Sequence, residues 1–201
     1  IGLITYLRTD STRVSETAEV QVKEFIESKY GDSYMAKEIN SKKSNKKIQD
    51  AHEAIRPTDV NLMPEEVKDQ LPRDLFRLYQ LIWRRFVASR MENSVYETTN
   101  VKVNAGKYIF NASTSKLDFD GFMKVYTDSD EKVVTNNTIA KLEKDSKLEF
   151  EKFEENQHFT QPPAHFTEAA LVKAMEEQGI GRPSTYAPTI TTIIARRYVT
   201  R

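Results

Sequence analysis

The first residues that could do chemistry lie near the start of the chain, in the stretch LITYLRTDST at 3–12. Tyr6 stands two positions before Arg8 and four before Asp10, and hydroxyl side chains lie nearby at Thr5, Thr9, Ser11 and Thr12. We expect a buried strand over 2–7. Because residues two apart share one face of a strand, Tyr6, Arg8 and Asp10 could project together, an arrangement that suits a phosphate. The alternative is a half-buried phenol beside a surface cation.

In the chemical interpretation, Tyr6 is a nucleophile that attacks a phosphodiester. A free phenol titrates near pH 10 and needs electrostatic help at neutral pH. Arg8 can supply that help, because a guanidinium stays charged and can bind two phosphate oxygens at once.

A second cluster, AHEAIRPTDV at 51–60, places a histidine, a glutamate and an arginine within five positions. A cationic imidazole at His52 can hydrogen-bond a phosphate, and a carboxylate such as Asp10 or Glu53 would stabilise its charge. The alternative is a histidine at a helix end whose hydrogen bonds go to the backbone. The cluster strengthens the phosphate interpretation of the first motif.

Helices are expected to position the two motifs. The pattern predicts one that runs to about residue 30, capped by Ser15 and ended by Gly31, and two more over 64–70 and 73–91, each with a proline suited to its first turn. In the last of these we expect six apolar side chains to pack inward: Leu75, Leu78, Leu81, Ile82, Trp83 and Phe86.

From residue 94 the apolar period changes from 3.6 to 2, which indicates a β-rich segment to about 162 with alternation at 95–103 and again near 148–153. Carboxylate pairs occur at Asp118 and Asp120 and again at Asp128 and Asp130. No third ligand is evident, so we interpret them as turn carboxylates and expect no metal site.

Helical signals return after 163. Thr167 should cap a helix ended by Gly179, and Ser184 should cap a second one that follows the segment GIGRPSTYA. Two helices joined by a glycine-rich turn resemble a helix-turn-helix. Arg182, Ser184 and Thr185 would lie at a helix N-terminus, where amides and hydroxyls suit a phosphate.

Composition excludes some classes of protein. The 201 residues carry 30 basic and 30 acidic side chains and no cysteine, so disulfides and thiolate metal sites are excluded. No apolar run is long enough for a membrane span and no secretory signal is visible, so we expect a cytoplasmic protein without a membrane partner. The zero net charge means that phosphate contacts need local Lys and Arg. The lysine-rich stretch 40–50 is interpreted as a solvated loop.

Four segments together resemble a known family. In order they are GLITYLRTDST, AHEAIRPTDVN, LYQLIWRRFVASRM and HFTEAALVKAMEEQGIGRPSTYAPTI, and they are similar to the conserved segments of bacterial type IA DNA topoisomerases from Gly2 to Val199. The resemblance implies an ATP-independent enzyme that cleaves one DNA strand through a 5′-phosphotyrosine, passes a strand, religates and relaxes negative supercoils. A non-catalytic DNA-binding helix-turn-helix module is the alternative.

The resemblance also implies residue roles. Tyr6 would be the nucleophile, Arg8 the cation that positions the phosphate, and His52 a contact to the DNA backbone that Asp10 orients. Further DNA contacts are expected from the side chains of Thr9, Ser11, Arg56, Arg182, Ser184 and Thr185.

The family's toprim domain, which carries the acidic Mg²⁺ cluster, has no counterpart in this sequence. We therefore expect an internal fragment that cannot cleave DNA alone and holds no cofactor, with Mg²⁺ bound by the toprim domain of the intact enzyme. The expected partners are that domain and single-stranded or negatively supercoiled DNA, and we expect a monomer in the bacterial nucleoid.

The expected fold class is α+β, in three parts. These are a mainly helical domain bearing the tyrosine at 1–93, a β-rich arch segment at 94–162, and the start of a helical DNA-binding domain at 163–201. We expect the gate to open by a hinge near the 93/94 boundary.

Overall fold

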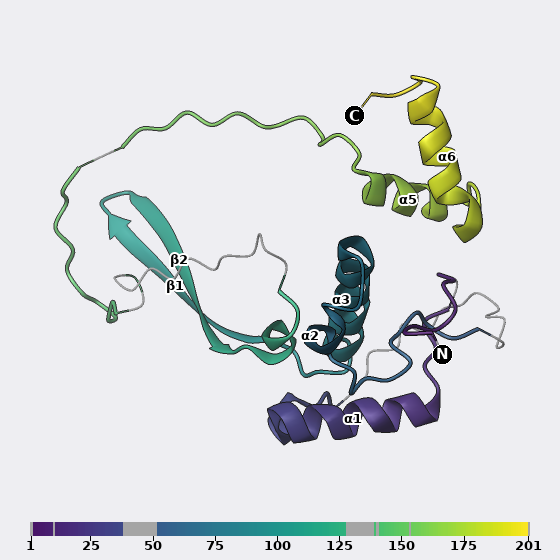
Figure 1. Cartoon of the computed structure of the whole chain (residues 1–201). Helices are drawn as coiled ribbons and strands as arrows, with labels where there is room; N and C mark the ends of the chain where they lie inside the picture. The colour runs from purple at the N-terminus through teal and green to yellow at the C-terminus, as the bar shows by residue number, and fades with distance from the viewer. Residues whose placement is uncertain are drawn as a thin grey trace. The chain divides into compact units, whose positions relative to one another are not determined.

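A computed structural model of the chain describes residues 2–9, 11–37, 52–127, 139, 141–152 and 154–200. It divides into two compact units, one of residues 1–7 and 11–147 and the other of 8–10 and 148–201 (Figure 1). Helices combined with one two-stranded antiparallel sheet confirm the α+β class. Among the described residues, no helix has the length and apolar character needed to cross a membrane.

The first unit is built around two helices, α1 (Glu16–Tyr30) and α3 (Arg73–Ala88), whose apolar faces pack together (Figure 1). The rings of Trp83 and Phe25 pack edge to face, with their centroids 5.6 Å apart. The indole nitrogen of Trp83 donates to the Val60 carbonyl at 2.9 Å. Each large apolar side chain buried in this way contributes about 1.5–3 kcal/mol. The buried cluster contains Val22, Phe25, Ile26, Val60, Val67, Tyr79, Trp83, Phe86, Val87 and Met91.

The predicted ends of α1 are confirmed. Ser15 is its N-cap residue, although the Ser15 side chain makes no capping hydrogen bond. Gly31 ends the helix with φ +97°, and its amide donates to the carbonyls of Ile26 and Glu27. A short 3₁₀ helix, η1 (Asp32–Tyr34), follows, and α2 (Pro64–Val67) is shorter than the predicted 64–70.

The predicted inward face of α3 is partly wrong. Trp83 and Phe86 are buried as expected, but Leu75, Leu78 and Leu81 are exposed, and Tyr79 takes a core position instead. Burial follows the spacing 79, 83, 86, 87, which is one face of a helix. Leu75 and Leu78 lie on the neighbouring face, in an open apolar groove that is also lined by Leu3, Ile4, Leu71, Tyr79 and Ile82.

Among its described residues, the predicted β-rich segment contains a single hairpin, β1 (Val95–Ala105) paired antiparallel with β2 (Tyr108–Phe119). Its turn is two residues long, and Gly106 adopts φ +62° there. Thr99, Val101 and Val103 are partly buried between exposed neighbours, so the predicted alternation is confirmed over 99–103. It is wrong at the start of the strand, where Val95 is exposed. The further strand predicted near 148–153 is wrong for its described residues, which are neither helix nor strand.

The base of the hairpin is tied to the helices. The phenol of Tyr34 donates to Asp120 at 2.7 Å, and the amide of Phe122 in the 3₁₀ helix η2 (Gly121–Lys124) donates to the Glu92 carbonyl at 2.9 Å. Each of these bonds joins a residue before the predicted hinge at 93/94 to a residue after it. Asp120 therefore has a structural partner, and Asp118 lies within β2 and not in a turn. Asp128, Asp130 and the stretch 40–50 lie outside the described residues.

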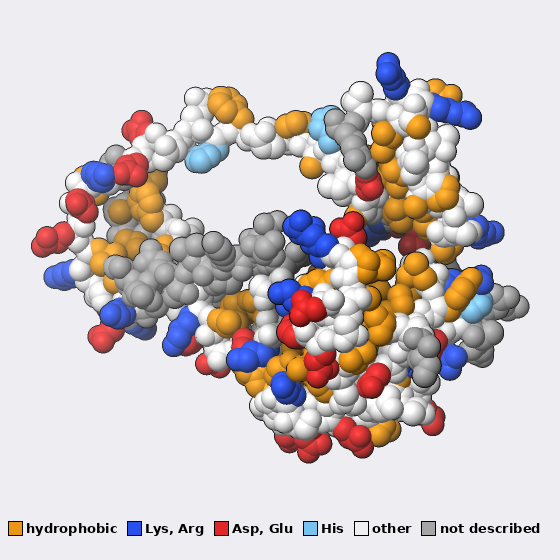
Figure 2. Space-filling view, viewed as in Figure 1, with side chains coloured by type: hydrophobic (Ala, Val, Ile, Leu, Met, Phe, Trp, Pro, Cys, Tyr) orange, Lys and Arg blue, Asp and Glu red, His pale blue; other side chains and the backbone are white. Residues whose placement is uncertain are grey.

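The second unit contains α5 (Glu168–Glu177) and α6 (Pro183–Ala195), and hydrophobic side chains are exposed over these helices (Figure 2). Thr167 caps α5 as predicted, because its hydroxyl accepts from the Ala170 amide at 3.1 Å. The predicted cap of the second helix is wrong. Helix α6 begins at Pro183 with Arg182 as its N-cap residue, so Ser184 lies inside the first turn.

Gly121 provides a test of the tie between hairpin and helices. A Cβ atom there would lie 2.5 Å from the Glu92 carbonyl oxygen, in a backbone with φ +49°. Gly121→Ala should lower the free energy of unfolding by about 2–4 kcal/mol, from left-handed strain plus the clash. Gly106→Ala is the matched control: it has φ +62° but open space around it, so about 1–2 kcal/mol is expected. Urea unfolding followed by the single tryptophan measures both, and equal losses would contradict the packing described.

Candidate active site

The two motifs meet through one antiparallel bridge between Ile4 and Pro57. The bridge is flanked by hydrogen bonds from the Thr5 amide to the Arg56 carbonyl at 2.9 Å and from the Thr58 amide to the Leu3 carbonyl at 3.0 Å. Ile4 and Pro57 thus form a pair that exchanges no hydrogen bonds, the kind of position where a proline costs no ladder bond. The predicted strand over 2–7 is wrong, since the pairing does not extend beyond this bridge.

Thr5 makes the densest set of contacts between the motifs. Its hydroxyl donates to the Ala54 carbonyl at 2.8 Å and accepts from the Arg56 amide at 3.0 Å, in addition to the bond from its own amide. The hydroxyl of Thr58 donates to the Gly2 carbonyl at 2.8 Å. Sequence reasoning named Thr5 only as one of several hydroxyls. The available signal was its place next to Tyr6, where successive side chains of an extended segment point to opposite sides.

Tyr6 follows Thr5 directly and presents its ring to solvent, with 81% of the residue exposed. The segment around it is neither helix nor strand, so its position depends on the bonds of the preceding residues. An exposed phenol next to a fixed backbone can meet a large substrate such as a polymer. The structure therefore fits the predicted nucleophile sterically, while the chemical role stays a prediction.

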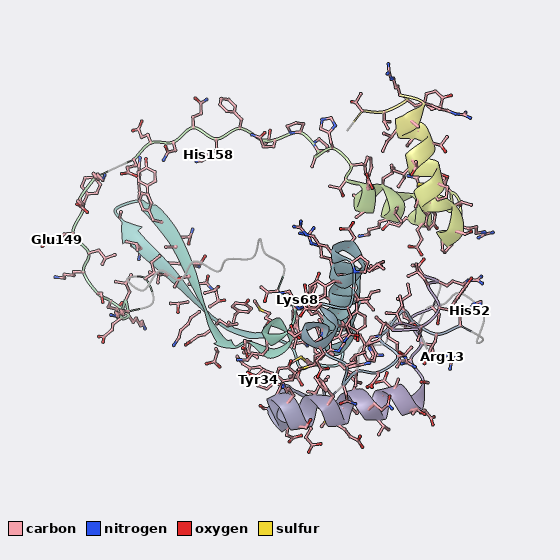
Figure 3. All side chains as sticks on the ribbon, in the orientation of Figure 1. Arg13, Tyr34, His52, Lys68, Glu149 and His158 are labelled. Atoms are coloured by element: carbon pink, nitrogen blue, oxygen red, sulfur yellow. The ribbon has the colours of Figure 1, made fainter. Side chains whose placement is uncertain are left out.

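His52 belongs to a segment that runs beside the start of α1. The Ala54 amide donates to the Arg13 carbonyl at 2.7 Å, and Figure 3 shows Arg13 and His52 in the same part of the first unit. His52 is half-buried. Because Thr5 bonds to Ala54, the histidine motif lies against the tyrosine motif.

Glu53 lies within this segment and binds both α1 and Arg56. Its Oε1 accepts from the Ser15 amide at 2.6 Å, and its Oε2 accepts from Nη2 of Arg56 at 3.1 Å. Burial alone would raise the pKa of the Glu53 carboxyl, but the hydrogen bonds from Ser15 and Arg56 and the Arg56 charge together lower it below its ordinary value. The carboxylate therefore stays ionised, and it pairs with Arg56 and the helix N-terminus.

The guanidinium of Arg56 is largely buried, with 12% of the side chain exposed. Besides Glu53, it donates to the Pro57 carbonyl at 2.9 Å. Its Nε is buried and has no hydrogen-bond acceptor among the described residues. These contacts are structural, and the DNA contact expected of Arg56 stays a prediction.

The other residues expected near Tyr6 differ in their surroundings. Arg8 and Thr9 are exposed, and both group with the second unit. Ser11 is buried, and its hydroxyl accepts from the Arg13 amide at 3.2 Å. Asp10 lies outside the described residues. DNA contacts by Thr9 and Ser11 and the roles of Arg8 and Asp10 stay predictions.

In the second unit, the three residues expected to bind a phosphate lie at the start of α6. The Thr185 hydroxyl accepts from the Arg182 amide at 2.8 Å and lies 3.1 Å from the Arg182 carbonyl, to which it donates. Gly181 precedes them with φ +80°, where a Cβ would lie 3.0 Å from the Thr185 hydroxyl. Arg182 and Ser184 are exposed at this turn, so the predicted placement is confirmed and their contact with DNA stays a prediction.

The similarity to known proteins extends over the residues of both motifs. A family model described as DNA topoisomerase matches residues 1–201. Among solved structures, the chain is similar to full-length topoisomerase I from Thermotoga maritima, with 37% sequence identity and a TM-score of 0.75. The match covers 100% of this chain and 32% of that one, so the chain spans less than half of the relative's length.

Thr5 provides a test of how the motifs are joined. Thr5→Val keeps the shape of the side chain but leaves the Arg56 amide and the Ala54 carbonyl without this partner, which should cost about 1–3 kcal/mol of unfolding free energy. Thr58→Val is the control, because it removes a bond between the same two segments at an exposed position, where water can replace it. Its expected cost is within about 0.5 kcal/mol. Equal costs in urea unfolding would show that Thr5 is not the main tie.

Proposed function

The chain belongs to the DNA topoisomerase family, and from this premise we propose that it is part of a type IA enzyme whose nucleophile is Tyr6. The observation that supports this most strongly is the pairing of the tyrosine motif with the histidine motif around Thr5, which leaves Tyr6 exposed beside it. Family membership makes DNA the substrate. The cleavage of a single strand, its passage and the relaxation of negative supercoils belong to the proposal.

In the proposed reaction the phenol oxygen of Tyr6 forms a bond to the phosphorus of a DNA phosphodiester. The bond from phosphorus to the 3′ oxygen breaks, so the 5′ phosphate is carried on the tyrosine and a 3′-hydroxyl is released. The phenol loses one proton in this step and the leaving 3′ oxygen gains one, so the protons balance. Religation reverses these steps, and because one phosphodiester replaces another, no ATP is needed.

Arg8 and His52 would act on the phosphate oxygens. Negative charge on these oxygens grows or shifts during the transfer, and fixed cationic donors stabilise it most when they are already in place. His52 is half-buried and the two residues after it are held by hydrogen bonds, which supports this role for His52. Asp10 would orient His52 or the DNA.

Magnesium chemistry would have to come from elsewhere in the longer protein. Within the ranges that the structure describes, no three His, Asp or Glu side chains gather into a group that could hold a metal ion. The described residues therefore do not fit the family's metal site, and no step above depends on one. We propose that a toprim domain of the same polypeptide binds Mg²⁺ and that this chain alone does not cleave DNA.

The second unit would hold the DNA strand. Arg182, Ser184 and Thr185 at the start of α6 offer a cation and hydroxyls at a helix N-terminus, which suits a backbone phosphate. The proposed enzyme acts as a monomer on single-stranded regions of DNA in the bacterial cytoplasm.

The proposed role of Tyr6 can be tested in the longer protein. Tyr6→Phe should bind single-stranded DNA with Kd changed by less than about twofold, because the ring remains for contact, but it should form no adduct that survives denaturation. Tyr108→Phe is the matched control, since Tyr108 is also exposed, at 61%, but lies at the hairpin turn. A labelled oligonucleotide on a denaturing gel reports both. An adduct in Tyr6→Phe would contradict the proposal, and unchanged relaxation in that variant would favour a non-catalytic DNA-binding module.

A further inference from the structure

We propose that Glu53 is a positioning residue that fixes the His52 imidazole for its contact with the DNA phosphate, and that Arg56 is its ionic partner in this task. The inference rests on the proposed function. In this proposal the charged pair of the histidine motif holds the segment in place. His52 is the group of that motif that contacts the substrate.

The Glu53 carboxylate is anchored at the start of helix α1. One of its oxygens accepts from the Ser15 amide at 2.6 Å, at the point where α1 begins. The Ser15 side chain makes no capping bond, so the carboxylate of Glu53 occupies that end of the helix from outside. A negative charge is favoured there by the helix dipole. The anchor therefore belongs to the packed part of the first unit.

Several hydrogen bonds hold the described residues that follow His52 in the chain. Glu53 is held by Ser15, Ala54 by the Arg13 carbonyl and the Thr5 hydroxyl, and the Arg56 backbone by Thr5. Of these anchored residues, Glu53 is the nearest to His52 in the chain. Because Glu53 follows His52 in the chain, a displacement of the Glu53 backbone shifts the His52 backbone that carries the imidazole, whereas Thr5 acts from farther along the segment.

Glu53 and Arg56 form a pair of opposite charges. The lowered pKa of Glu53 keeps its carboxylate ionised next to the Arg56 guanidinium. A glutamine at 53 could still accept from Ser15, but it would leave a largely buried guanidinium without its anion, which is unfavourable. The segment should then shift or loosen. Misplacement of a catalytic group by about 1 Å can cost about 100-fold in rate.

The chain offers a matched control. Glu19 of α1 pairs with Arg90 at 2.7 Å, and the exposed side-chain fractions are 12% for the arginine and 23% for the glutamate, the same as for Arg56 and Glu53. The Glu19 pair contacts neither motif in the bonds described above. Glu19→Gln therefore reports what the loss of a comparable ion pair does to the fold alone.

The experiment measures single-turnover cleavage of a saturating single-stranded oligonucleotide by the longer protein with Mg²⁺, together with noncovalent Kd. Glu53→Gln should cleave about 10- to 100-fold more slowly with Kd changed by less than about twofold, while Glu19→Gln should cleave like the unmodified protein. Glu53→Asp, which keeps the charge, should recover part of the rate. Thermal unfolding of each variant shows that the folded protein is compared.

A second comparison separates positioning from general loss of structure. If Glu53 acts through His52, its substitution should change the rate by less than about twofold in a His52→Ala background, because double-mutant cycles report such coupling. A defect of the same size with and without His52, or an equal defect in Glu19→Gln, would overturn the inference. The unmodified protein separates failure of the positioning role from failure of the proposed function. If the unmodified protein forms no Tyr6-dependent adduct, the proposed function fails and there is no cleavage rate to compare.

Discussion

The non-hydrogen-bonded pair of Ile4 and Pro57 is the constraint on which the candidate site depends. It joins segments about fifty residues apart with two flanking backbone bonds, and the Thr5 hydroxyl adds two more. Buried or half-buried polar groups must find such partners, because an unmade bond is costly. The pairing ends at once, which leaves Tyr6 outside regular structure and open to solvent while the residue before it is held.

The packed helices give this junction a firm base. Helix α1 supplies the N-terminus on which Glu53 is anchored, and its opposite end packs with α3 through Phe25 and Trp83. The same unit includes the base of the hairpin, where Tyr34 binds Asp120 and Phe122 binds Glu92. Tyr6, the proposed nucleophile, and the base of the proposed arch belong to one compact unit, so bonds would have to break if the gate opened at 93/94.

Local signals predicted much of this fold, and long-range contacts account for the misses. The bounds of α1, the cap of α5 and the alternation in β1 follow from residues near each other in the chain. The predicted buried face of α3 is partly wrong because the Tyr79 hydroxyl donates to the Leu62 carbonyl at 2.6 Å, which lets the ring lie in the core. The periodicity of apolar residues does not reveal such a contact. The roles of Thr5 and Glu53 depend on partners in other segments. The motifs themselves were found because spacing and residue type are visible in sequence.

The central claim is that the tyrosine and histidine motifs form one phosphate site. A crystal structure of the longer protein with Tyr6→Phe and a bound single-stranded oligonucleotide tests it most directly. One DNA phosphate should lie within hydrogen-bond reach of the His52 imidazole, about 3 Å, and in contact with the phenyl ring at position 6. A strand whose phosphates lie away from both residues would contradict it.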